Sequence, residues 1–345
     1  MHVLNTLGGT ADPSGFSLAE SADWLRSTAF FRRRQRNAIV VAMESATYED
    51  QFGRAGRRLE RLYRPVRRCF RRARGIPSDI LVEIRWRLGD EVMAIPIYEA
   101  LRAAYPPCRI TVLCNYPELL DGNPFVDVVN EIRHDPDRYI LLRSGPRHVY
   151  RLDHYARCAR VATPGTRPRL HYSDWSSPLL ADIEKPFVAV CPNASWTTKR
   201  WPIERWRTLC HSLLDVGFHV VELGAGDEHI GVGHNLVNRT SIREAACVLR
   251  AARLLICCDS GLMHLALAAG TRVLALFGPT DPSILIRDEA RLTSIVVERD
   301  CHGCWNREIE FEQPGVCPLN RPTCLDAVTA QDVFSQARPI LETGA

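Results

Sequence analysis

Residues 254–277 read LLICCDSGLMHLALAAGTRVLALF, and this stretch decides the class of fold. The apolar runs at its two ends, 254–258 and 273–277, have the length of strands that are buried in a sheet. The apolar residues between them, 262–269, fit a helix. A strand, a helix and a strand in this order form a βαβ unit, which predicts a parallel sheet and therefore an α/β protein.

Two series of alternating strands and helices extend outward from this stretch. The first consists of a strand, a helix and a strand at 80–84, 88–105 and 109–114. The second begins with a strand, a helix, a strand and a helix at 187–191, 202–217, 219–223 and 241–252. We therefore predict two doubly wound, Rossmann-like domains with a boundary within residues 163–186, where proline and serine interrupt the pattern.

The predicted organisation has three parts. Residues 1–78 form an Arg-rich N-terminal extension, and residues 79–180 form the first Rossmann-like domain. Residues 181–345 form the second domain, which includes a cysteine-rich tail at 298–326.

The composition is that of a soluble globular protein. Hydrophobic residues make up 46% of the 345 residues and charged residues 24%, which excludes a chain that is disordered throughout. The sequence has no apolar run long enough for a membrane-spanning helix and no basic start followed by an apolar stretch, so we expect no secretory signal. Thirteen cysteines, an odd number, favour a reducing, cytoplasmic compartment over a disulfide scaffold.

The positive charge is concentrated in the N-terminal extension. Residues 1–78 hold 15 Arg, no Lys and 7 acidic residues, and the rest of the chain is negative. Residues 54–74, RAGRRLERLYRPVRRCFRRAR, place apolar residues three and four apart, which predicts a helix with one cationic face. Three hypotheses remain: a solvated basic helix, a peripheral contact with an anionic membrane, and a nucleic-acid-binding arm, which the lack of interleaved aromatics disfavours.

Four loops are expected to build the functional site, because ligands of doubly wound sheets bind beyond the carboxyl ends of the strands. These loops are 85–91, 192–200, 223–229 and 259–264.

Asp90 follows Gly89 in the first loop, at the expected start of a helix. Capping explains an Asp at this position, because its carboxylate accepts hydrogen bonds from unpaired backbone N–H groups. A carboxylate that faces a cleft can also serve as a general base. The spacing leaves both interpretations open and favours the cap.

The second loop brings Thr197, Thr198 and Lys199 together directly after a strand. Such a cluster can hold a phosphate through charge-assisted hydrogen bonds, although an ordinary surface loop would have similar residues.

The fourth loop, 259–264, leads into a helix whose first turn offers unpaired N–H groups and the positive end of the helix dipole. This pattern favours an anion site at Ser260, Gly261 and His264. A capped helix with a core-facing histidine is the alternative.

Together these stretches resemble glycosyltransferase family nine, the heptosyltransferases of bacterial surface-glycan assembly. The matching pieces are ILVEIRWRLGDEVMAIPIYEALRAAYP at 80–106, DGNPFVDVV at 121–129, PNASWTTKRWPIERW at 192–206 and NRTSIREAACVLRAARLLICCDSGLMHLALAAGTRVLALFGPTDP at 238–282. The resemblance implies a GT-B fold, in which two Rossmann-like domains face a cleft and the C-terminal one holds the nucleotide sugar.

The resemblance also implies a reaction: inverting transfer from a nucleotide-activated sugar, typically ADP-L-glycero-D-manno-heptose, to a hydroxyl group, without a catalytic cofactor. The family's catalytic base falls on Asp90. The implied donor-binding residues are Thr197, Thr198, Lys199, Glu228, Asp259, Ser260, Gly261 and His264. Two departures, Glu83 within the first strand and Trp86-Arg87 before Gly89, put the acceptor side in question.

The tail contains a CxxC pair, Cys301 and Cys304, followed by Cys317 and Cys324. Four thiolates with this spacing suit a structural zinc or iron ion, and free thiols in a loop-rich tail are the alternative. Some members of the family that glycosylate autotransporter proteins carry a similar iron-bound cysteine cluster, so the resemblance also admits a protein acceptor.

The predicted function is therefore transfer of heptose from ADP-heptose to a glycolipid or protein acceptor, in the cytoplasm, with the arm as a peripheral contact to the inner membrane. Three other hypotheses remain open at this stage. The chain could use a different nucleotide sugar or a small-molecule acceptor, or it could keep the nucleotide site without catalysing transfer. It could also bind nucleic acid through the arm and a zinc knuckle, although such a protein has no need of a sugar-nucleotide site.

Overall fold

The protein is described by a computed structural model over residues 79–106, 108–132, 136–287, 289–297, 299–307, 316–317 and 324–343. The predicted Arg-rich extension and parts of the predicted cysteine-rich tail lie outside these residues. The described strands form two sheets, and every strand pair in both sheets is parallel.

The first sheet has four strands in the order β3-β2-β1-β4. Its elements, in chain order, are β1 (Asp79–Ile84), α4 (Leu88–Ala104), β2 (Arg109–Cys114), η2 (Pro117–Leu120), β3 (Val128–Val129), β4 (Arg138–Leu141) and α5 (Arg151–Ala159). The predicted strand, helix and strand are confirmed within one residue at each end.

The second sheet has six strands in the order β10-β9-β8-β5-β6-β7. Its strands are β5 (Phe187–Cys191), β6 (His219–Glu222), β7 (His234–Asn235), β8 (Leu255–Cys258), β9 (Val273–Phe277) and β10 (Leu292–Val296). Its helices are α6 (Ile203–Asp215), α7 (Ile242–Ala251), α8 (Gly261–Ala269), α9 (Pro282–Leu285) and α10 (Ala330–Glu342), and two short 3₁₀ helices are η3 (Pro178–Asp182) and η4 (Thr197–Lys199).

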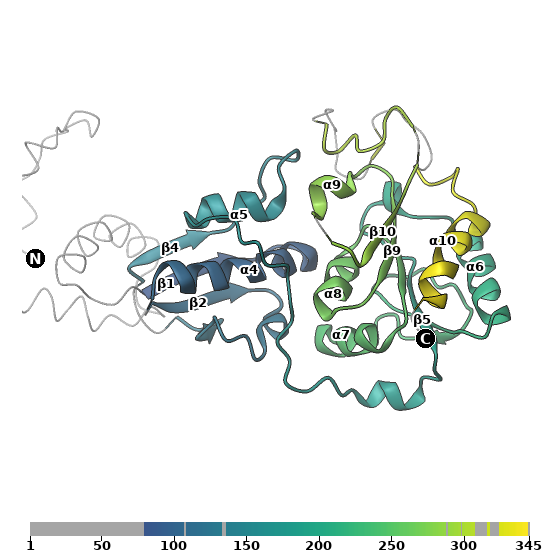
Figure 1. Ribbon diagram of the computed structural model, residues 1–345, viewed down its shortest axis with the longest axis horizontal. Helices are drawn as coiled ribbons and strands as arrows, with labels where there is room; N and C mark the ends of the chain where they lie inside the picture. The colour runs from purple at the N-terminus through teal and green to yellow at the C-terminus, as the bar shows by residue number, and fades with distance from the viewer. Residues whose placement is uncertain are drawn as a thin grey trace, which may run out of the picture. The chain divides into compact units, whose positions relative to one another are not determined.

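Helices cover both faces of the second sheet. Figure 1 shows α7 and α8 on one side of its strands and α6 and α10 on the other. Successive side chains of a strand point to opposite faces, so Ala189 packs with α7 and α8 while Val188 and Val190 pack with α6 and α10. A sheet that is buried on both faces needs continuous apolar strands, which explains the runs that decided the fold.

The helix that follows β5 forms as its sequence predicts. Pro202 occupies the N-cap position of α6, and Trp206, Leu209 and Leu213 are fully buried on one of its faces. The helix α7 begins with a capping box, in which Ser241 and Glu244 satisfy each other's backbone N–H groups.

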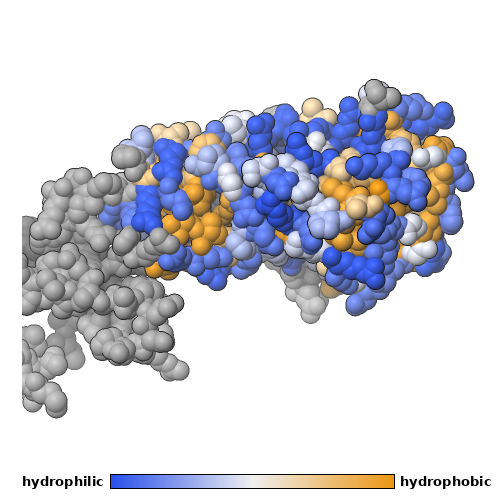
Figure 2. All heavy atoms as spheres, turned by 90° about the horizontal axis from the view of Figure 1, so that it is seen from below, coloured by the Kyte–Doolittle hydropathy of each residue, from blue (hydrophilic) through white to orange (hydrophobic). Residues whose placement is uncertain are grey.

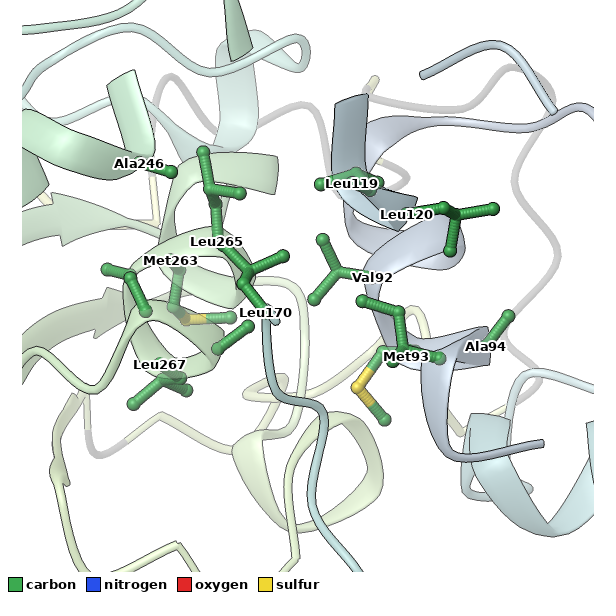
Figure 3. Packing of buried hydrophobic residues seen from close by; sticks show 14 of the residues in the cluster. Val92, Met93, Ala94, Leu119, Leu120, Leu170, Ala246, Met263, Leu265 and Leu267 are labelled. Atoms are coloured by element: carbon green, nitrogen blue, oxygen red, sulfur yellow. The ribbon is translucent and has the colours of Figure 1, made fainter. Parts of the chain in front are cut away.

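An apolar contact joins the two sheets through α4 and α8. The buried residues of α4, η2, α7 and α8 belong to one continuous hydrophobic cluster. Figure 3 shows Val92 of α4 and Leu119 of η2 turned toward Leu265 of α8 and Leu170. The backbone of Leu170 also donates a hydrogen bond to the carbonyl of Ala268, at 3.1 Å. Because of this contact, the first turns of α4 and α8 lie next to each other.

On the face shown in Figure 2, hydrophilic residues predominate and hydrophobic residues are interspersed among them. Large hydrophobic side chains with substantial exposure, such as Trp86, Leu214 and Val296, come from separate elements. Among the described residues, none of the helices combines the length and the hydrophobicity that crossing a membrane would require.

Candidate functional site

The strand order of the second sheet brings the loops after β5 and β8 together at one edge. The chain passes from β5 to β6 on one side of β5 and then returns to β8 on its other side. This reversal makes a topological switch point between β5 and β8, where ligands of open α/β sheets bind. Lys199 follows β5 and Asp259 follows β8, so both lie at the switch point.

Lys199 and Asp259 form a buried ion pair. The Lys199 Nζ atom lies 2.5 Å from Oδ2 of Asp259, and the side chains are only 14% and 6% exposed. The hydroxyl of Thr280, beyond β9, donates a second hydrogen bond to the same oxygen, at 2.8 Å. Burial acts to raise the pKa of Asp259, but the Lys199 ammonium and the Thr280 hydroxyl more than offset it and hold that pKa below its ordinary value.

The helix α8 begins beside this ion pair. Ser260 is its N-cap residue, and no hydrogen bond from the helix reaches the Ser260 side chain as a cap. The first N–H groups of α8, from Gly261 onward, are therefore not satisfied by that side chain, which suits an anion site. His264 lies in this first turn, and burial lowers its pKa despite the opposing charges of Asp259 and Asp90, so the imidazole is neutral near pH 7.

Asp90 does not cap α4, so the interpretation that the spacing favoured is wrong. Arg87 occupies the N-cap position, and Asp90 lies in the first turn. Oδ1 of Asp90 lies 3.2 Å from Nε of Arg151 and accepts a hydrogen bond of 3.3 Å from the hydroxyl of Tyr155. Burial, and then the charge of Asp90, raise the pKa of Tyr155 well above its ordinary value, so its hydroxyl keeps its proton and donates.

Both contacts of Asp90 use the same oxygen. Over the described residues, Oδ2 of Asp90 makes no hydrogen bond. Arg151 and Tyr155 lie four residues apart on α5, so both reach the carboxylate from one face of that helix. Asp90 is therefore held by one oxygen, and its other oxygen can accept a proton.

Gly89 brings Asp90 next to the second sheet. A Cβ atom at Gly89 would lie 2.7 Å from Cδ2 of His264, closer than two non-bonded carbons approach. A Cβ atom at Gly261 would similarly lie 3.0 Å from Cβ of Leu88. The first turns of α4 and α8 therefore pack directly on each other. Asp90, Asp259 and Lys199 form a group of charged residues around His264, and all three influence the pKa of His264.

The other predicted donor-binding residues lie around this group. Thr198 is buried in η4, whereas Thr197 beside it is exposed. Glu228 lies in the exposed loop after β6, where its Oε1 is 3.6 Å from Nη1 of Arg200 and its carbonyl accepts a hydrogen bond from Asn193. Glu228 thus belongs to the same edge of the sheet but is not in contact with the buried ion pair.

The loop after β1 is held by a buried carboxylate. Glu91 is 3% exposed and accepts hydrogen bonds from the backbone N–H groups of Trp86, Asn115 and Tyr116, at 3.2, 2.9 and 3.0 Å. Burial outweighs these hydrogen bonds and raises the pKa of Glu91. Trp86 remains 41% exposed although its indole N–H donates to the carbonyl of Leu142, so its ring stands at the edge that carries Asp90.

Glu83, the unexpected acid within β1, has partners in the first sheet. It accepts a hydrogen bond from the hydroxyl of Tyr139 in β4, and Nε of Arg85 lies 3.7 Å away. This residue is accounted for by contacts within the sheet.

The four predicted metal ligands lie near one another. The turn that holds Cys301 and Cys304 is bound to the loop after β9, since the backbone of residue 303 donates to the carbonyl of residue 278 at 3.3 Å. Burial, and then the thiols of Cys304, Cys317 and Cys301, raise the pKa of Cys324 to about 11. In the part of the tail that is described, however, no three or more His, Cys, Asp or Glu side chains are arranged to hold a metal.

Sequence reasoning missed several residues of the site. Arg151 and Tyr155 lie on a helix that carries no motif, and only the fold brings them to Asp90. The position of Thr280 could have indicated its role, because it belongs to the loop Gly278-Pro-Thr-Asp281 at the carboxyl end of β9. Trp196 and Trp305 contact each other across a separation of more than 100 residues, which no local pattern could predict.

Comparison with known proteins bears on most of this site. Residues 160–313 match the model of glycosyltransferase family 9 (heptosyltransferase). This match confirms the resemblance over a stretch that contains Lys199, Asp259 and His264. Asp90 lies before the matched residues, so its role depends on the geometry described above.

Characterised heptosyltransferases are similar in sequence over part of their length. Lipopolysaccharide heptosyltransferase 1 of Pseudomonas aeruginosa is 34% identical over 180 residues, which are 47% of this chain and 50% of that protein. Lipopolysaccharide heptosyltransferase 2 of Escherichia coli (strain K12) is 31% identical over 114 residues, which are 29% of this chain and 33% of that protein. The chain thus spans half or less of the length of these curated relatives.

Solved structures are similar over more of the chain. ADP-heptose lps heptosyltransferase II of E. coli has a TM-score of 0.59 at 19% identity, over 77% of this chain and 99% of that chain. The iron-containing dodecameric glycosyltransferase TibC of enterotoxigenic E. coli has a TM-score of 0.67 at 17% identity, over 78% and 77% of the two chains. These similarities confirm the predicted α/β fold with parallel sheets, of the GT-B-like kind.

Proposed function

We propose that this chain is an inverting glycosyltransferase that moves heptose from ADP-heptose to a hydroxyl group during assembly of the lipopolysaccharide core. The observation that carries the proposal is the packing of Gly89 on His264. This contact joins a carboxylate suited to general-base catalysis with a helix N-terminus and a lysine suited to a diphosphate. The relatives are heptosyltransferases, so binding of nucleic acid is not favoured.

The donor would bind through Lys199 and the first turn of α8. An ammonium group has three donors, and one of them is used by Asp259, so two remain for the diphosphate. The N–H groups that follow Ser260 would hold the same group from the positive end of the helix dipole. Thr197 is exposed beside Lys199 and would add a hydroxyl contact, and Glu228, which is also exposed, would bind the ribose.

In the transfer step, Oδ2 of Asp90 would take the proton of the acceptor hydroxyl. The acceptor oxygen would form its bond to the anomeric carbon from the face opposite the diphosphate, which inverts the configuration. The bond from the anomeric carbon to the diphosphate oxygen breaks, and its electron pair leaves with ADP. Lys199 and the α8 N-terminus would stabilise that charge, while Arg151 and Tyr155 keep the Asp90 carboxylate in place.

The acceptor that this function implies is a glycolipid at the cytoplasmic face of the inner membrane. Residues 54–74 would attach the enzyme there, since each basic residue near an anionic surface contributes about 1 kcal/mol. A protein acceptor remains the alternative, and a transfer assay that offers both kinds of acceptor distinguishes them.

The four tail cysteines would hold a structural metal ion, zinc or iron, with no part in the transfer step. Their CxxC spacing supports this proposal, and TibC is an iron-containing protein of similar fold. Elemental analysis of the purified chain tests it: Cys304→Ser should lose the metal, and Cys210→Ser, which changes a buried cysteine of α6, should keep it. A wild-type chain without metal would refute the proposal.

Release of ADP from ADP-heptose, measured with a lipopolysaccharide core acceptor, tests the proposed reaction. Asp90→Asn should lower the rate by roughly 10²- to 10⁴-fold, because the asparagine side chain has the shape of aspartate but cannot accept the proton. Asp153→Asn is the matched control, since Asp153 also pairs with an arginine, Arg287 at 3.1 Å, but lies outside the group around His264. Equal rates for wild type and Asp90→Asn would show that the base is assigned wrongly.

A further inference from the structure

A series of aromatic and cationic side chains connects residues 301–307, the cysteine-rich turn, to Lys199, the lysine proposed to bind the donor. The Lys199 Nζ atom lies 4.3 Å from the centre of the Trp196 ring. The ring of Trp196 meets that of Trp305 edge to face, with centres 4.6 Å apart and an angle of 69° between planes. The guanidinium carbon of Arg147 lies 3.7 Å from the centre of the Trp305 ring. Lys199, Trp196, Trp305 and Arg147 thus form one cation–aromatic column.

A second connection joins the same turn to the same lysine. The N–H of Trp305 donates to the carbonyl of Pro279, at 2.9 Å, and the Asn306 side chain accepts from the N–H of Asp281, at 2.8 Å. Both bonds fix the loop that contains Thr280, whose hydroxyl binds Asp259, the partner of Lys199. The turn therefore supports Lys199 in two ways. It contacts Trp196, which lies against the ammonium group, and it holds the loop that binds the counter-ion, Asp259.

The turn is also bound to the first sheet's side of the molecule. The buried Asn306 side chain donates to the carbonyl of Arg147, at 2.6 Å, which fixes the residue that stacks on Trp305. Arg147 lies in the segment between β4 and α5, and α5 carries the two residues that hold Asp90. The cysteine-rich turn thus contacts the segment before α5, which holds Asp90, and the loop after β9, which holds Asp259.

We propose that Trp305 is a positioning residue for binding of the donor diphosphate, and that it acts through Trp196 on Lys199. A lysine side chain has many rotamers, and confining it before the ligand arrives removes part of the entropy cost of binding. The aromatic faces attract the ammonium group and the guanidinium group from opposite ends of the column. The cysteine-rich turn is then a support of the nucleotide site rather than a separate module. This inference rests on the proposed function, since it needs a donor with a diphosphate.

Calorimetric titration of the full chain with ADP tests the inference. Trp305→Ala should weaken ADP binding by roughly fivefold to tenfold, the lower end of what the loss of one cation–aromatic contact and one aromatic pair corresponds to. Trp305→Phe keeps an aromatic ring and should recover most of the affinity. Trp175→Ala removes a tryptophan that stacks under Arg250 and contacts Tyr172 instead, and it should bind ADP as the wild type does.

Adenosine separates positioning from general damage. Adenosine lacks the diphosphate, so its affinity, measured by competition, should be the same in Trp305→Ala and wild type. If Trp305→Ala does not fold, Arg147→Ala replaces it, with an expected twofold to threefold loss for ADP and none for adenosine. Equal ADP affinity in a folded variant and wild type, or equal losses for ADP and adenosine, would overturn the inference alone. A wild-type chain that binds no ADP would overturn the proposed function and the inference with it.

Discussion

Replacing Lys199 by methionine should destabilise the protein through the carboxylate that it leaves behind. The Lys199 and Asp259 side chains are 14% and 6% exposed, so solvent screens their interaction only weakly. Removing one partner of a buried ion pair commonly costs about 3–5 kcal/mol, because the remaining charge has no partner. Asp259 keeps the hydroxyl of Thr280, so we expect the lower end of that range, about 3 kcal/mol.

The loss of stability in Lys199→Met should depend on pH, because protonation of Asp259 removes its buried charge. In the wild type, the pKa of Asp259 lies below its ordinary value of 3.8, so the pair stabilises the fold above that pH and is lost only as the pH falls through the lowered pKa. In Lys199→Met the ammonium group is absent, so burial should raise the pKa of Asp259 above its ordinary value. Protonation then removes the unpaired charge, so the stability difference from wild type should shrink as the pH falls from about 7 to about 4.5.

Thermal unfolding followed by circular dichroism at both pH values measures this effect. For an unfolding unit of about 150–250 residues, such as the second domain, a loss of about 3 kcal/mol corresponds to a fall in Tm of roughly 6–12 °C at pH 7. Lys185→Met is the control, because Lys185 is exposed, and its Tm should be close to that of the wild type. A Lys199→Met variant with wild-type Tm, or with the same deficit at both pH values, would refute the account of this ion pair.

Three further perturbations test other parts of the structure. Tyr155→Phe removes one hydrogen bond to Oδ1 of Asp90, so kcat in the ADP-release assay should fall by roughly tenfold while ADP affinity from calorimetry is unchanged; a loss of ADP affinity would contradict this positioning role. Gly89→Ala puts a Cβ atom 2.7 Å from the His264 ring, so its Tm should fall, and adding His264→Ala should restore part of it; a Tm equal to wild type would show that the two helices can separate at no cost. Replacing the arginines of residues 54–74 by glutamine in the full chain should weaken sedimentation with anionic vesicles, and unchanged sedimentation would contradict the membrane contact.

Much of the fold was predictable because its strands are buried on both faces. Continuous apolar runs identify β5, β8 and β9 directly, and their bounds agree with the prediction within one residue. The short strand β7, His234–Asn235, has no such signal, because a two-residue strand at the edge of a sheet is defined by its neighbour and not by its composition.

The second-sheet part of the site was predictable from loop position. Lys199, Asp259 and His264 follow parallel strands, and the switch-point rule places the ends of those strands together. The pairing of Lys199 with Asp259 was not predictable, because it depends on side-chain direction within a loop.

Asp90 shows where the sequence alone is insufficient. An acid in the first turn of a helix is stabilised by the helix dipole wherever it occurs, so its presence does not distinguish a cap from a base. The distinction comes from Arg151 and Tyr155, which lie more than 60 residues away on a helix without a motif. The metal prediction has the same limitation, since CxxC spacing specifies two thiols and leaves the remaining ligands to the tertiary fold.

Calorimetric titration of the wild-type chain with ADP, UDP, GDP, CDP and ADP-heptose tests the central claim most directly. The proposed function predicts that ADP and ADP-heptose bind and that the other nucleotides do not, with binding lost in Lys199→Ala. Preferential binding of another nucleoside diphosphate would contradict the ADP-heptose assignment, and no binding by any of the five would contradict the nucleotide-sugar site itself.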